Sequence, residues 1–176
     1  CKGHNRRNTH LIALAPTANN SIISGGVSAG IEPISANVMA IKTAKGTFIR
    51  YNPTLKELLI SKNKDTIEVW SEIIKATGSV QGLSFLSEEE KLAFKTAREM
   101  NQHTIIKLAA QRQRYIDQGQ SVNLFFSSNA SAKYIHEVHL SAWQLGLKGL
   151  YYFRSESALT GDVSYKSQAD CVACEA

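Results

Sequence analysis

The sequence predicts an α/β fold in which parallel strands are joined by helices. Two apolar stretches, 121–127 (SVNLFFS) and 147–154 (LKGLYYFR), flank a helical stretch at 131–146, with short joints between them. A strand, a helix and a second strand in this order form a right-handed βαβ unit with parallel strands. Because 121–127 is apolar at nearly every position, we expect a strand that is buried on both faces.

The first fifty residues predict strands separated by loops. The stretch 9–16 (THLIALAP) is expected to be a strand ended by Pro16, and 37–51 a hairpin that turns at Lys45-Gly46. Between them, the small polar run 17–21 (TANNS) precedes a helix start, where backbone N–H groups can bind an anion. A plain turn with an Asn or Ser cap has the same pattern. The residues alone favour the plain turn and leave the anion site open.

Helices are predicted in the middle of the chain. Asn52 and Pro53 begin a helix over 54–61 as its cap and first residue. Asp65 is expected to cap a helix over 66–77 that ends at Gly78. The residues expected to share its buried face are Ile67, Trp70 and Ile74.

Two further helices are expected before the βαβ unit, and one within it. Ser87 and Glu90 predict a capping box at the start of 88–100. The next helix covers 103–118 and ends at Gly119. Its expected stripe is Ile105, Ala109 and Ile116. In the helix 131–146 the expected inward residues are Ile135, Val138, Ala142 and Leu145, with Gly146 just past its end.

Composition and length exclude several classes of protein. A chain of 176 residues supports one domain with a real core. Its net charge of +5 is spread over scattered basic residues, and no apolar run is long enough for a membrane span. We therefore expect neither nucleic acid nor membrane as a partner. Three cysteines do not make a disulfide scaffold and indicate a cytoplasmic protein. The chain begins with Cys1, and its first methionine is Met39, which favours a fragment.

Tyr151 and Tyr152 are adjacent near the carboxyl end of the last predicted strand, where parallel α/β folds collect their chemistry. Neighbouring strand residues point to opposite faces. The plain interpretation is therefore one ring in the core and one in an outer layer. A shared function requires both hydroxyls to lie close together beside a pocket.

Cys171 and Cys174 are separated by two residues in a polar, patternless tail over 156–176. A disulfide between them would close a very small loop and stabilise little. A dithiol on a flexible tail suits thiol–disulfide exchange. The alternative is half of a zinc site, with His136 and His139 as the other ligands, although this pair lacks the spacing of a helical metalloprotease motif.

Four stretches together resemble the carboxyl-terminal part of the large, catalytic subunit of class I ribonucleotide reductase. They are 7–21 (RNTHLIALAPTANNS), 30–38 (GIEPISANV), 115–127 with 139–154 (YIDQGQSVNLFFS and HLSAWQLGLKGLYYFR), and the tail with its cysteines. The resemblance covers essentially the whole chain. It implies that 1–155 forms the carboxyl-terminal part of a ten-stranded α/β barrel with a helical insertion, followed by a flexible, redox-active tail at 156–176.

The resemblance also implies roles for particular residues. Tyr151 and Tyr152 would relay a radical from the metal-containing small subunit to an active-site cysteine, with Tyr152 the nearer. Cys171 and Cys174 would shuttle electrons from thioredoxin or glutaredoxin. The phosphates of a ribonucleoside diphosphate or triphosphate would lie on the loop Pro16, Thr17, Ala18, Asn19, Asn20 and Ser21.

The same resemblance implies what this segment lacks. The radical-forming cysteine, the reducible cysteine pair, the pocket asparagine and glutamate, and the allosteric nucleotide (ATP) sites belong to earlier sequence. We therefore expect the segment to bind no metal or cofactor itself, to need the remainder of the large subunit and to be inactive alone. No role follows for residues 60–95. The rival interpretation is a small zinc- or phosphate-binding module that uses the cysteine tail with His136 and His139. A weaker third is a basic phosphate or nucleic-acid binder.

Overall fold

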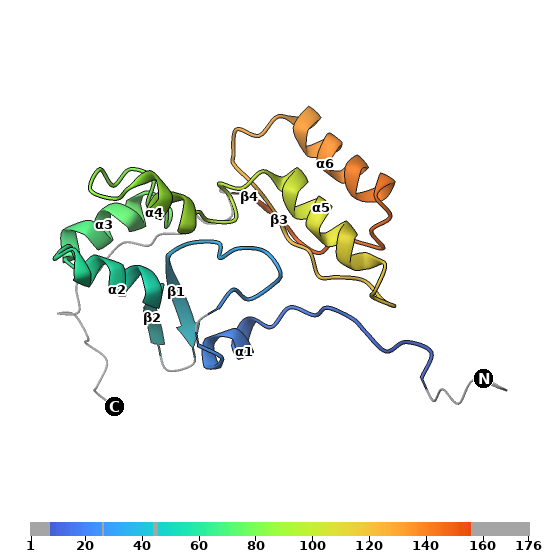
Figure 1. Cartoon of the computed structure of the whole chain (residues 1–176), viewed down its shortest axis with the longest axis horizontal. Coiled ribbons are helices and arrows are strands. Elements are labelled where there is room, and N and C mark those ends of the chain that lie inside the picture. The colour runs from blue at the N-terminus through green and yellow to red at the C-terminus, as the bar shows by residue number, and fades with distance from the viewer. Residues whose placement is uncertain (1–7, 26, 44–45, 156–176) are drawn as a thin grey trace, which may run out of the picture.

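The computed structural model describes residues 8–25, 27–43 and 46–155 (Figure 1). The predicted tail, with Cys171 and Cys174, lies outside this part of the chain, as does Cys1. In chain order the helices and strands are α1 (Ala18–Ile23), β1 (Val38–Thr43), β2 (Gly46–Tyr51), α2 (Pro53–Ser61), α3 (Ile67–Lys75), α4 (Glu88–Ala93), α5 (Gln102–Gln113), β3 (Leu124–Phe126), α6 (Ala132–Gln144) and β4 (Phe153–Ser155).

The predicted βαβ unit is confirmed. β3 and β4 pair in parallel with Leu124 opposite Phe153, and α6 connects them. Residues 122–126 are all buried, as expected for a strand covered on both faces. Figure 1 shows α5 and α6 side by side next to this strand pair.

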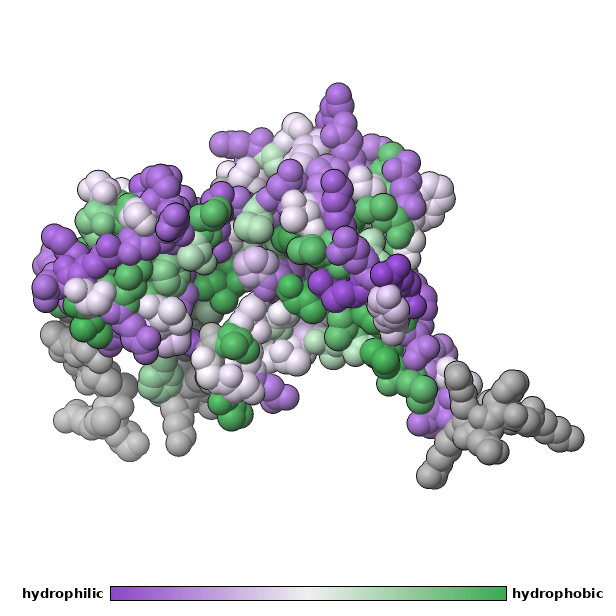
Figure 2. All heavy atoms as spheres, in the orientation of Figure 1, coloured by the Kyte–Doolittle hydropathy of each residue, from purple (hydrophilic) through white to green (hydrophobic). Residues whose placement is uncertain are grey.

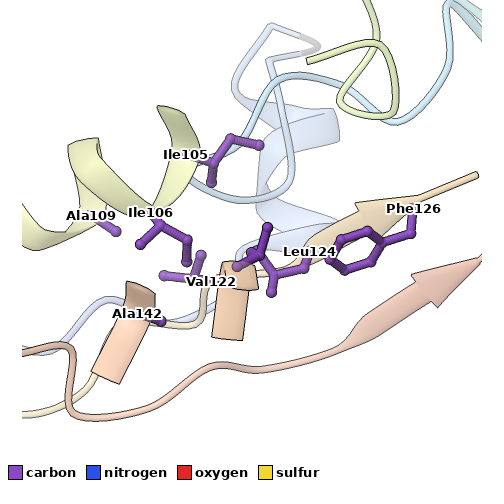
Figure 3. Packing of buried hydrophobic residues seen from close by; sticks show 8 residues of the cluster. Ile105, Ile106, Ala109, Val122, Leu124, Phe126 and Ala142 are labelled. Carbon is purple, nitrogen blue, oxygen red and sulfur yellow. The ribbon is translucent and has the colours of Figure 1, made fainter. Parts of the chain in front are cut away.

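One apolar core joins α5, β3 and α6. Its buried members are Ile105, Ile106, Ala109, Val122, Leu124, Phe126, Val138 and Ala142, most of them labelled in Figure 3. The inward stripes predicted for both helices are therefore largely confirmed. Leu145 is the exception at 48% exposed, because it is the C-cap of α6 and lies beyond the helical repeat.

The strand predicted at 9–16 is reduced to one parallel bridge, between Leu14 and Gln120. The Leu14 carbonyl accepts the Ser121 N–H at 2.9 Å. Leu11 and Ile12 remain 65% and 49% exposed, and Figure 2 shows apolar surface along this segment. The predicted strand was too long because, within the described residues, the backbone of this segment bonds to only one neighbouring stretch.

The chain before and through β3 lies between two other segments. Gly119 and Ser121 bond to Leu14 on one side, whereas Val122 and Leu124 bond to the backbone of the tyrosine pair on the other. This follows from strand geometry, in which successive residues direct their backbone groups to opposite edges. Three parallel stretches are thus held together around 118–126.

The predicted hairpin is confirmed as β1 and β2, antiparallel with Val38 opposite Tyr51. Asn52 caps α2 through its side chain, and Pro53 begins that helix, also as predicted. A second apolar core lies beneath α2 and α3, and its buried members are Leu55, Leu59, Trp70, Ile73, Val80, Leu83 and Leu86.

The expected start of α3 is wrong by one residue. Thr66 is the N-cap, and its side chain accepts the Val69 N–H. Asp65 instead accepts the Trp70 Nε1–H at 2.6 Å, which ties the helix start to a buried ring. The expected face is also wrong in part, since Ile67 is 67% exposed and Ile73 is buried in its place.

Two predicted helices are shorter than expected because their backbones find other partners. The capping box of Ser87 and Glu90 is confirmed, but α4 ends at Ala93 instead of residue 100. The Ala97 N–H donates to the distant Ile34 carbonyl at 2.8 Å, so it is not available to a helix. α5 ends before 118 because the Gln113 side chain donates to backbone carbonyls after the helix.

Candidate functional site

A cavity of about 490 Å³ opens beside the tyrosine pair. Its walls come from the 16–39 stretch, from the end of β2 and the start of α2, from Arg98, from the β3 strand and from the residues around the start of β4. The cavity thus joins two of the three regions that the sequence singled out, the loop at 16–21 and the tyrosines.

The two tyrosine rings lie against each other in a tilted arrangement, and both line this cavity. Their ring centroids lie 4.1 Å apart with 51° between the ring planes. The Tyr151 hydroxyl donates to the Tyr152 hydroxyl at 3.4 Å. Both rings line the cavity and are about half exposed, at 47% and 52%. The shared arrangement that the sequence left as the less expected alternative is the one observed.

The reason is that the pair precedes β4 and is not inside a regular strand. β4 begins at Phe153, so Tyr151 and Tyr152 lie at its amino end, and the expectation of a carboxyl-end position was wrong. Their backbone still bonds to the adjacent stretch of this chain, because the Tyr151 N–H donates to the Val122 carbonyl at 2.8 Å. Because the side chains of residues outside a regular strand need not alternate between its two faces, both tyrosines can line the same cavity.

The way in which the parallel stretches are staggered brings the start of the 16–21 loop to the same level as the two tyrosines. Leu14 is paired with Gln120, and Leu124 with Phe153. If the first pairing continues in parallel by two residues, Pro16 lies opposite Val122. If the second pairing is followed back by two residues, Tyr151 also lies opposite Val122, and Tyr152 lies opposite Asn123. The carboxyl end of the first stretch is therefore level with the amino end of β4, on the opposite side of the 118–126 stretch.

Within the loop, the described residues differ in where they lie. Pro16 and Ser21 line the cavity, and Ser21 is buried. The Thr17 N–H donates to the Ala29 carbonyl at 2.9 Å, and α1 follows immediately without a side-chain cap. Asn20 is exposed, and the side chains of Ala18 and Asn19 lie outside the described atoms.

Positive charge dominates the cavity wall. Arg50, Arg98 and Arg154 line it, with Glu32 as the acidic residue among the lining residues. The Arg154 guanidinium lies 5.0 Å from the Tyr152 ring centroid, within the range of a cation–π contact.

The pKa of Tyr151 is raised above its ordinary value of 10.0. The hydrogen bond to Tyr152 is the largest cause, because it stabilises the protonated hydroxyl, and repulsion between two ionised phenols adds to it. Arg154 acts in the opposite direction. Tyr151 therefore stays protonated through the neutral range.

Sequence reasoning missed the arginines and two buried polar residues, Glu32 and Asn123. Asn123 could have been found as the polar residue inside the apolar run 121–127. Glu32 lies in the 30–38 stretch that carries part of the family resemblance.

The zinc alternative is not tested, because Cys171 and Cys174 lie outside the described residues. Among the described residues, no group of three or more histidine, cysteine or acidic residues gathers. His139 uses its Nδ1 to contact the Ile135 carbonyl at 2.7 Å and stacks near Phe126 and Phe153. Within residues 8–155, apart from the gaps at 26 and 44–45, no helix is both long and apolar enough to span a membrane.

Comparison with known proteins gives one consistent family. The model of the ribonucleotide reductase barrel domain matches residues 1–153. The chain is 45% identical over 186 residues to the ribonucleoside-diphosphate reductase large subunit of Invertebrate iridescent virus 3, covering 99% of this chain and 30% of that protein. It is 36% identical over 161 residues to the large chain 2 of Saccharomyces cerevisiae, covering 88% and 18%.

A solved structure agrees with these sequences. The class Id ribonucleotide reductase alpha subunit of Actinobacillus ureae superposes with a TM-score of 0.76 at 44% identity, over 88% of this chain and 28% of that one. The chain thus spans less than a third of the length of these relatives, and its fold is a piece of their α/β barrel. Because the family model covers most of its residues, the chain belongs to the family of ribonucleotide reductase barrel domains.

Proposed function

We propose that this chain is part of a ribonucleoside-diphosphate reductase large subunit, in which it holds the substrate phosphates, relays the radical and carries the shuttle dithiol. One observation carries the proposal: the hydroxyls of Tyr151 and Tyr152 lie 3.4 Å apart on a cavity that the 16–21 loop also lines. A generic tyrosine pair in a strand would point to opposite faces.

The phosphate role rests on the start of α1. Its first turn has no side-chain cap, so backbone N–H groups there suit an anion. The three arginines of the cavity wall favour a polyphosphate electrostatically. The proposed group is Pro16, Thr17, Ala18, Asn19, Asn20 and Ser21, with a ribonucleoside diphosphate or triphosphate as the ligand.

The relay moves one electron and one proton together. When the Tyr151 phenol has lost both, its bare oxygen can accept the Tyr152 hydroxyl proton along the line that now holds their hydrogen bond. The Tyr152 electron follows, which restores Tyr151 and leaves Tyr152 as the neutral radical. Tyr152 then takes a hydrogen atom from a cysteine thiol of the subunit. A phenylalanine has no hydroxyl proton and would stop this sequence.

The remaining partners belong to the same proposal, and the exposure of two side chains supports the first of them. Tyr152 and Phe153 are half exposed although parallel strands are normally covered on both faces. We propose that the remainder of the large subunit covers them. The small subunit would supply the radical from its metal site, and thioredoxin or glutaredoxin would reduce Cys171 and Cys174. This segment itself would bind no cofactor, and the assembled enzyme would work in the cytoplasm.

The test is Tyr151→Phe and Tyr152→Phe in the large subunit assembled with this chain and its small subunit. Each change should abolish turnover and leave the dissociation constant for the nucleotide unchanged, because the phenyl rings still fill the same space. Tyr115→Phe is the matched control, since Tyr115 is exposed and lies outside the cavity wall. Retained turnover in either relay variant would disprove the assignment.

A further inference from the structure

Arg154 carries a positive charge that has no ion-pair partner among the described residues. Its side chain is exposed and lines the cavity. Glu32, the acidic residue of the cavity wall, is buried, and its carboxylate accepts the backbone N–H of Asn123. An exposed guanidinium on a cavity wall, with five N–H donors, is therefore available to an anionic ligand.

The same guanidinium lies over the second tyrosine of the pair. Its central carbon is 5.0 Å from the centroid of the Tyr152 ring, and that ring also lines the cavity. Arg154 belongs to β4, where its backbone is held opposite Phe125. The strand thus fixes the base of the arginine side chain, and the cation–π contact places its charged end at the tyrosine pair.

The 16–21 loop borders the same cavity at the level of this pair. Pro16 and Ser21 line the cavity together with Arg154. If the two pairings continue in parallel, Pro16 and Tyr151 lie on the two sides of Val122, about 10 Å apart, which is two strand spacings. The cavity holds about 490 Å³, which is the size of a small-molecule site. One polyphosphate can therefore contact both the loop and the arginine.

We propose that Arg154 is a phosphate-binding residue whose charge is shared between the bound nucleotide and the tyrosine pair. The inference rests on the proposed function and deepens it, because it adds a ligand from β4 to the phosphate loop. A guanidinium donates two parallel N–H groups to phosphate oxygens and so suits a nucleoside diphosphate or triphosphate. Phosphate binding neutralises the charge over Tyr152, so the pair is in a different electrostatic state with and without substrate.

The effect on the pair has a definite sign. The hydrogen bond to Tyr152 raises the pKa of Tyr151, whereas the Arg154 charge lowers it. A phosphate that neutralises this charge removes the lowering, and its own negative charge acts in the same direction. The pKa of Tyr151 should therefore rise when a nucleotide binds. A higher pKa opposes loss of the proton alone, which suits a relay that moves the proton and the electron together.

The first test compares ligand affinities in the assembled large subunit. Arg154→Gln should weaken binding of cytidine 5′-diphosphate and of inorganic pyrophosphate about tenfold each, the value of one hydrogen-bonded charge contact. Arg154→Lys should lose less, because an ammonium keeps the charge without the paired donors. Turnover at saturating nucleotide should persist in Arg154→Gln with a raised KM, because both phenols remain.

Arg114→Gln is the matched control. Arg114 is also exposed, and its guanidinium carbon lies 4.7 Å from the centroid of the Tyr115 ring, but neither residue lines this cavity. Its replacement should change neither affinity. Unchanged affinity for both ligands in Arg154→Gln overturns the phosphate role. A loss for cytidine diphosphate alone also overturns it, because the arginine would then contact the nucleoside.

The second test follows tyrosinate absorbance in an alkaline titration, with the Tyr151→Phe variant to assign the transition. Saturating pyrophosphate should move the Tyr151 transition upward in the wild type and by less in Arg154→Gln. The other charged residues of the wall, Arg50, Arg98 and Glu32, are the same in both proteins. An equal shift in both would refute the shared charge.

Failure of this inference is distinguishable from failure of the proposed function. If the wild-type subunit binds nucleotide and the tyrosine variants lose turnover, normal binding by Arg154→Gln refutes the role of the arginine alone. If the wild-type subunit binds neither nucleotide nor pyrophosphate, both ideas fall together.

Discussion

The Tyr151 hydroxyl donates a hydrogen bond to the Tyr152 hydroxyl at 3.4 Å, although both rings are about half exposed. This bond is the largest cause of the raised pKa of Tyr151. It joins the two phenols into one unit, so a change at one should be measurable at the other.

Tyr152→Phe should lower the pKa of Tyr151 toward 10.0, because it removes both the hydrogen bond and the neighbouring ionisable phenol. Absorbance of tyrosinate during an alkaline titration measures the shift. Arg154→Gln should move the same pKa further upward, since the guanidinium lowers it. An unchanged alkaline transition in Tyr152→Phe would contradict the pairing.

Asp117 should anchor the segment before α1 in a pH-dependent way. Its carboxylate accepts the N–H groups of Leu11 and Ile12 at 2.9 and 3.1 Å, which lowers its pKa below 3.8. A lowered folded-state pKa gives stability that is present above pH 3.8 and is lost as the pH falls through the folded-state value.

Hydrogen exchange at the Leu11 and Ile12 amides measures this anchoring. Protection should be present at neutral pH and should decrease once the carboxyl is protonated. Asp117→Asn should show reduced protection already at neutral pH, with no further acid transition. Equal protection in the variant and the wild type across this range would rule out the carboxylate as the anchor.

Gly78→Ala should destabilise the fold by a few kcal/mol, through two separate effects. Gly78 has φ +86, and an added Cβ would overlap the Ala36 side chain and lie 2.8 Å from the Ala36 Cα. Gly146→Ala is the matched control, because it has φ +78 but open space around the added Cβ. Gly146→Ala should lower the free energy of unfolding by only about 1 kcal/mol, which is the penalty for placing an alanine at positive φ. Urea denaturation measures both, and equal losses would show that the contact with Ala36 is unimportant.

Cys171→Ser should stop the proposed electron shuttle after a single round in the assembled enzyme. With thioredoxin as the reductant, turnover should cease once the active-site cysteines are oxidised, whereas dithiothreitol should restore it by reaching them directly. Product formed per enzyme with each reductant is the measurement. Sustained turnover with thioredoxin would remove the shuttle role from this cysteine.

Local signals in the sequence predicted most helix and strand positions. The cap at Asn52, the capping box of Ser87 and Glu90, the hairpin and the βαβ unit are each determined by residues close together in the chain. Helix ends were predicted less well. The Ala97 N–H, for example, bonds to the Ile34 carbonyl, and no local pattern reports that bond.

The sequence by itself determined the α/β class, the parallel βαβ unit and the family, because periodicity, caps and motif residues act over short distances or are visible as letters. Only the tertiary structure decided that both tyrosines face one cavity and that Pro16, Glu32 and Asn123 meet there. Those contacts depend on strand stagger and on bonds between residues far apart in the chain. Such relationships are fixed by packing the whole domain, so short-range patterns do not encode them.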